Sequence, residues 1–160
     1  MKKIICILLT LTIIACLTAC GCPEPTMPDL VFTFKDTEII MHAQAQPIVK
    51  ALGGPFQYTE APSCAFDGTD KTYYYGSFYL TTYPKDGVDC ISGLWFADDS
   101  VATAEGITIG SSRQAVEEAY GPEYFDGENA FEIPGKDATL TILLTGGMVS
   151  SVQYEAVFSY

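Results

Sequence analysis

The stretch KTYYYGSFYLTTY, residues 71–83, decides the fold. Its two halves are rich in aromatic and β-branched residues, which favour strands. Gly76-Ser77 between them has the composition of a two-residue hairpin turn. With that turn, Tyr74 lies opposite Tyr79, and the stretch predicts an antiparallel β-hairpin.

The two faces of this hairpin differ in chemistry, because side chains alternate along a strand and opposed residues share a face. The face that we expect to meet the core carries Tyr73, Tyr75, Phe78, Leu80 and Thr82. The other face carries Thr72, Tyr74, Tyr79, Thr81 and Tyr83. Trp95 joins this second face if Leu94 and Phe96, its neighbours in the next predicted strand, point to the core.

The second face is the candidate partner-binding surface, with Tyr74, Tyr79, Tyr83 and Trp95 as its site residues. Tyrosine and tryptophan offer a large contact area at low entropic cost and are enriched where proteins bind partners. The alternative is that they are ordinary strand residues, which the rest of the chain covers.

Strand-like runs continue on both sides of the hairpin. They are Gln57–Glu60, Ser63–Phe66, Asp89–Phe96, Asn129–Ile133, Ala138–Leu144 and Val149–Phe158. Gly146-Gly147 is a second two-residue turn.

Two short segments resemble each other at an offset of 68 residues: PIVKALGGP at 47–55 and AVEEAYGP at 115–122. Each is typical of a helix that glycine and then proline bring to an end. Ser111 with Gln114 three residues later predicts a capping box at the start of the second helix. The sequence therefore predicts an α+β fold of two tandem repeats, residues 31–100 and 101–160, each a short helix packed on an antiparallel β-meander.

The N-terminus has the features of a secretory signal. Lys2 and Lys3 precede the apolar run Ile4–Leu17, which at about 14 residues is too short for an ordinary membrane span. Leu17-Thr18-Ala19-Cys20 resembles the bacterial lipobox, and Ile13-Ile14-Ala15-Cys16 is a weaker copy. The resemblance implies removal of residues 1–19 and a diacylglycerol on Cys20. The chain would then lie on the outer face of the cell membrane, with residues 20–30 as a proline-containing tether.

The charge narrows the range of partners. The chain has 160 residues, with 8 basic and 20 acidic side chains. Loss of Lys2 and Lys3 with the signal leaves 6 basic residues and a formal charge of −14. Such a surface argues against nucleic acid, which needs a basic patch. Metal ions, cationic peptides and basic protein patches fit the charge, which also serves solubility.

Cys64 and Cys90 are the two cysteines of the predicted globular part. Outside the cell they could form a disulfide, which would stabilise the fold by roughly 3–4 kcal/mol. The alternative is two free thiols that act as small hydrophobes.

Catalytic chemistry finds little support in the sequence. His42 is the single histidine, and Asp98-Asp99 with Glu105 lack the spacing of a calcium-binding EF-hand loop. We expect no enzyme, no cofactor and no metal site. Non-covalent binding of an envelope or secreted protein or peptide is the expected function. The alternative, a small-ligand or glycan binder, would need a concave aromatic pocket.

Two longer stretches carry a family resemblance. SCAFDGTDKTYYYGSFYLTTYP (63–84) and DDSVATAEGITIGSSRQAVEEAYG (98–121) resemble uncharacterised lipoproteins of Gram-positive bacteria. The predicted layout is also similar to β-lactamase-inhibitor-protein-like folds and to BamE-like envelope lipoproteins. That likeness implies a non-catalytic, protein-binding module.

Overall fold

The computed structural model describes residues 27–158. The predicted signal peptide, Cys20 and the start of the predicted tether lie outside the described residues. The strands are β1 (Phe32–Phe34), β2 (Thr37–Ile39), β3 (Gln57–Pro62), β4 (Thr69–Tyr74), β5 (Phe78–Lys85), β6 (Val88–Phe96), β7 (Ala130–Pro134), β8 (Ala138–Thr145) and β9 (Met148–Ala156). The helices are α1 (Ala45–Leu52), α2 (Arg113–Tyr120) and the short 3-10 helix η1 (Pro122–Tyr124).

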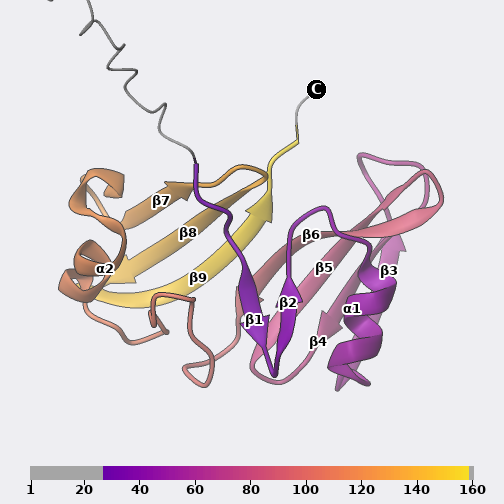
Figure 1. The fold of residues 1–160 in the computed structure, drawn as a ribbon, viewed down its shortest axis with the longest axis horizontal. Coiled ribbons are helices and arrows are strands. Elements are labelled where there is room, and N and C mark those ends of the chain that lie inside the picture. Colours follow the sequence, from indigo (N-terminus) through magenta and orange to yellow (C-terminus); the bar gives the residue numbers. More distant parts are fainter. Residues whose placement is uncertain (1–26, 159–160) are drawn as a thin grey trace, which may run out of the picture.

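Seven strands form one antiparallel sheet in the order β3-β4-β5-β6-β9-β8-β7, and β1 with β2 forms a small sheet of its own. Figure 1 shows the β1–β2 hairpin and α1 in front of the sheet, and α2 beside its β7–β9 end. The strands of the two halves of the chain meet where β6 pairs with β9 over Gly93–Trp95.

The predicted α+β fold of two tandem helix-on-meander repeats is wrong. The structure is mostly β, with 45% strand and 14% helix. Each α-helix has eight residues and buries one side chain completely, Ala45 in α1 and Val116 in α2. Helices this short do not form layers of their own, and the strands of both halves pair into one sheet over one continuous core.

The local hairpins agree better with the sequence. Tyr74 pairs with Tyr79 and Tyr73 with Leu80, as predicted. Thr145 pairs with Met148 across Gly146-Gly147, which confirms that turn. Both of these glycines have positive φ, the conformation that glycine adopts without strain.

Two local predictions are corrected, and one hairpin was missed. Residues 63–66 form no strand but a connection, in which the Ser63 Oγ accepts hydrogen bonds from backbone N–H groups. The β1–β2 hairpin was not predicted, and its turn places Lys35 and Asp36 at positive φ. The cap of α2 is Ser112 rather than Ser111, because the Ser112 Oγ accepts from the N–H of Ala115.

The core lies on one face of the sheet, under β1, β2 and the helices. Phe32 of β1 packs between elements of both halves, with ring centroids 5.3 Å from Phe78, 5.4 Å from Phe96 and 6.1 Å from Tyr154. The last residues of the predicted tether also contact the fold, since the Pro28 carbonyl accepts a hydrogen bond from the N–H of Lys136. On the opposite face, Tyr74 of β4, Tyr79 of β5 and Trp95 of β6 are partly exposed.

Tyr75 places a polar hydroxyl group in the core. It is 7% exposed, and its hydroxyl has no hydrogen-bond partner among the described residues. We expect Tyr75→Phe to leave the free energy of unfolding unchanged or to raise it by about 1 kcal/mol at neutral pH, because an unsatisfied buried hydroxyl is removed. Chemical denaturation measures this, and a loss above 1 kcal/mol would show that the hydroxyl is bonded.

The same variant should change the alkaline limb of the stability curve. Burial raises the pKa of Tyr75 to about 12. The unfolded chain, with an ordinary tyrosine pKa of about 10, therefore loses this proton first, so the folded state loses stability as the pH rises from about 10 towards 12. The stability difference between Tyr75→Phe and the natural chain should grow in favour of the variant over this range.

Candidate binding face

One row of residues crosses the open face of the sheet from edge to edge. The strand registers align Gln57, Tyr74, Tyr79, Trp95, Gln153, Thr141 and Glu132, one residue from each of the seven strands. Three of the four predicted site residues, Tyr74, Tyr79 and Trp95, therefore lie side by side on β4, β5 and β6.

These three rings are stacked on one another, and we call them the aromatic ladder. The ring centroids of Tyr74 and Tyr79 are 4.5 Å apart with an interplanar angle of 26°, and those of Tyr79 and Trp95 are 4.9 Å apart at 15°. Nearly parallel rings can approach this closely only face to face, and the separations match the spacing of adjacent strands, about 4.8 Å. The ladder therefore stands up from the sheet and presents its ring edges and its two outer ring faces.

A row of small and polar residues runs beside the ladder. It consists of Thr59, Thr72, Thr81, Gly93, Glu155, Thr139 and Pro134. Gly93 leaves a gap in this row, and a side chain there would be tight, since a Cβ would lie 3.0 Å from the Thr81 Oγ1 and 3.2 Å from the Tyr154 carbonyl.

The gap opens into a shallow depression of about 280 Å³. Its wall includes Trp95, and polar groups of Ser92, Gln153 and Glu155 line it. Ser92 is the extra residue of a β-bulge in the β5–β6 ladder, and its Oγ donates to the Thr81 Oγ1 at 3.0 Å.

Tyr83, the fourth predicted site residue, is not accessible. It is 5% exposed, and the rings of Phe66 and Phe158 cover it, with centroids 4.8 and 5.0 Å away. Its hydroxyl lies 2.8 Å from the Nδ1 of His42, whose Nε2 lies 3.1 Å from the Val157 carbonyl. His42 and Tyr83 thus hold the C-terminal segment against the sheet, and burial raises the pKa of Tyr83.

Cys64 and Cys90 are both free thiols in the structure. Cys64 is exposed in the connection between β3 and β4, and Cys90 is buried on β6 opposite Tyr83. Strands β4 and β5 separate β3 from β6 in the sheet.

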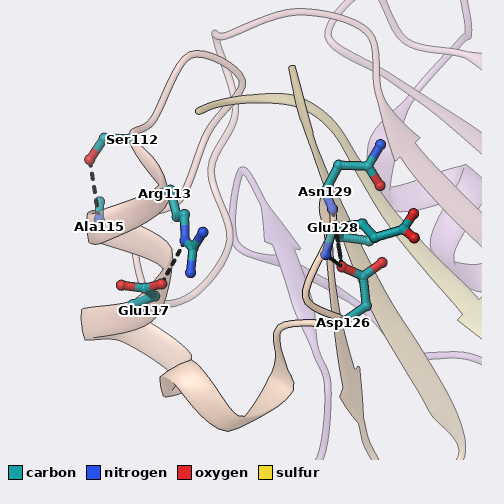
Figure 2. A network of polar contacts seen from close by, with 8 residues as sticks. Ser112, Arg113, Ala115, Glu117, Asp126, Glu128 and Asn129 are labelled. Atoms are coloured by element: carbon teal, nitrogen blue, oxygen red, sulfur yellow. Dashed lines mark hydrogen bonds and ion pairs between the residues drawn. The ribbon is translucent and has the colours of Figure 1, made fainter. Parts of the chain in front are cut away.

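The polar side chains around α2 serve the local fold. Figure 2 shows the Ser112 cap on Ala115 and the ion pair of Arg113 with Glu117, whose atoms are 2.7 Å apart. The Asp126 carboxylate accepts hydrogen bonds from the backbone N–H groups of Glu128, Asn129 and Ala130. Those backbone hydrogen bonds lower the pKa of Asp126. Within residues 27–158, no group of three His, Cys, Asp or Glu side chains is placed to hold a metal ion.

No protein-family model, no curated protein and no solved structure matches this chain. None of the helices in the described part of the chain has the length and apolar character that a membrane span requires. The fold and the geometry of the aromatic ladder are therefore the basis for a functional proposal.

Proposed function

We propose that the chain is a lipid-anchored extracytoplasmic binding module, without catalytic activity, that holds a protein or peptide partner through the aromatic ladder. The observation that carries the proposal is the stack of Tyr74, Tyr79 and Trp95 on the open face. Stacked rings are already ordered before a partner arrives, so binding costs little side-chain entropy.

The surroundings of the ladder favour an extended partner over an enclosed ligand. Phe56, 79% exposed, lies next to Tyr74 with ring centroids 6.3 Å apart, so the apolar surface continues beyond the sheet edge at β3. Partly exposed aromatic side chains in a group, with threonine and glutamine beside them, have the composition of a protein-binding hot spot.

A small ligand or glycan is the second candidate. The depression beside Trp95 offers one ring face with hydroxyl, amide and carboxylate groups nearby, which is the chemistry that a sugar uses. Its small volume favours at most one sugar unit.

The anchor rests on the lipobox-like Leu17–Cys20 and on the resemblance to Gram-positive lipoproteins. Two acyl chains give stable attachment where one would be marginal. We propose the outer face of the cell membrane as the site of action.

The test compares partner binding by residues 23–160 with the natural sequence and by the same residues with the double substitution Tyr74→Ala, Tyr79→Ala. Each protein is immobilised and exposed to the envelope and secreted proteins of the source cell. Leu143→Ala is the control, since Leu143 is 37% exposed on β8, away from the ladder. We expect the double variant to lose more than tenfold in affinity for a retained partner and the control to bind normally.

Trp95 is the single tryptophan of the chain and lies at the end of the ladder, so its emission reports occupancy directly. A partner that binds both variants equally, without changing this emission, would contradict the ladder as the site. An emission change with soluble sugars alone would favour the glycan candidate.

A further inference from the structure

A second cavity lies on the other side of the sheet from the ladder. It has a volume of about 290 Å³ and is lined by the segment before β1, the loop before α2, the end of α2 with η1, and the sheet. Its lining consists of Pro28, Asp29, Leu30, Val31, Ala104, Glu105, Ala119, Tyr120, Tyr124, Ile133 and Tyr154. We call it the tyrosine–carboxylate pocket, and it is independent of the function proposed for the ladder.

The floor of the pocket is formed by a tyrosine whose side chain is almost completely buried. Tyr154 of β9 is 2% exposed and packs beside Phe32, yet it lines the cavity. Within residues 27–158 its hydroxyl makes no hydrogen bond that contributes to its pKa. Burial, and secondly the charge of Glu105, raise the pKa of Tyr154, so the hydroxyl is neutral at physiological pH and is available to a ligand.

A chain of hydrogen bonds orients the carboxylate at the pocket wall. The Tyr120 hydroxyl donates to the Glu105 carboxylate and lies 2.7 Å from the Thr103 Oγ1. Because a phenol has one proton, the Thr103 hydroxyl donates in the second contact. The Thr103 Oγ1 in turn accepts from the N–H of Ile107, and such a chain polarises each of its members.

The charges of the pocket have one sign. Asp29 and Glu105 are its charged lining residues, and no lysine or arginine is among them. Leu30, Val31 and Ile133 supply apolar walls. Carboxylates beside tyrosine rings attract a cation and repel an anion, and the apolar walls favour a cation with a hydrocarbon part.

We propose that the tyrosine–carboxylate pocket binds a small organic ammonium ion, with its N–H groups donating to Glu105 and to the Tyr154 hydroxyl, and with its alkyl part against Leu30 and Ile133. The volume is at the lower limit for ligand pockets, which restricts the ligand to a short primary amine. The shared negative charge of the site and of the whole chain raises the local concentration of such a ligand.

The test uses radiolabelled n-butylammonium in equilibrium dialysis against the full-length lipoprotein in phosphatidylcholine nanodiscs, with empty nanodiscs subtracted. 1-Butanol and butyrate, which have similar sizes but no positive charge, are the comparison ligands. We expect saturable binding of one butylammonium per chain, weakened by salt, and affinities at least tenfold lower for both comparison ligands.

Three variants locate the binding. Glu105→Gln keeps the shape of the side chain and should lower the butylammonium affinity at least tenfold, and Tyr154→Phe, which keeps the ring, should lower it several-fold. Glu132→Gln, an exposed carboxylate on the opposite face, should bind as the natural chain does. No saturable binding, equal binding of 1-butanol, or an unchanged affinity in Glu105→Gln would each overturn the proposal.

Discussion

Residues 27–100, produced without the rest of the chain, should remain unfolded, although they include six of the nine described strands. Without β9, β6 loses its neighbour over Gly93–Trp95, and Phe32 and Phe96 lose the ring of Tyr154 that packs against them. The core is one cluster with members on both sides of residue 100, so each half alone exposes apolar surface that it cannot cover.

Far-UV circular dichroism and the dispersion of amide NMR signals measure this result. Residues 101–160 alone should also be unfolded, while residues 27–160 should unfold in a single cooperative transition. A cooperative transition for residues 27–100 alone would contradict a sheet that needs both halves.

Local structure could be predicted well from the sequence because short-range rules determine it. The positions of Gly76 and Gly146-Gly147 in tight turns followed from composition, and the pairing of Tyr74 with Tyr79 followed from counting outward from the turn. The cap moved by one residue, from Ser111 to Ser112, because two adjacent serines have the same propensity and only the geometry of the turn separates them.

The joining of the strands could not be predicted in the same way. Gly93 of β6 pairs with Glu155 of β9, 62 positions later in the chain. The composition of these strands does not indicate that they are neighbours. The similarity of the two helix segments favoured two separate repeats, but helix-stop signals report on helix ends and carry no information about sheet pairing. The short β1 and β2 strands were missed because three residues give no clear alternation.

The same distinction applies to the candidate site. Alternation along β4 and β5 placed Tyr74 and Tyr79 on one face, and the structure brings them together with Trp95. Alternation could not show that Phe66 and Phe158 cover Tyr83, because that coverage depends on the path of two distant segments. The tyrosine–carboxylate pocket had no sequence signal for the same reason, since Glu105, Tyr120 and Tyr154 come from three separate elements.

Replacement of Cys20 by serine should release the protein from the membrane almost completely. Diacylglycerol attaches to a thiol, so Cys20→Ser has no acceptor for it, and two acyl chains provide roughly 0.8 kcal/mol for each buried methylene. The formal charge, −12 for the whole chain and −14 if residues 1–19 are removed, gives no attraction to anionic lipids that could substitute for the anchor.

Metabolic labelling with palmitate measures the loss of the lipid in Cys20→Ser. Fractionation of the source cell measures the release of the variant from the membrane. The chain offers two matched controls, Cys16→Ser and Cys22→Ser, which remove neighbouring thiols and should leave the label and the membrane fraction unchanged. Loss of the label in Cys16→Ser instead would move the lipidation site to the weaker lipobox copy. A Cys20→Ser chain that stays in the membrane without a label would show that the apolar segment itself is the anchor, and the tether model would then be wrong.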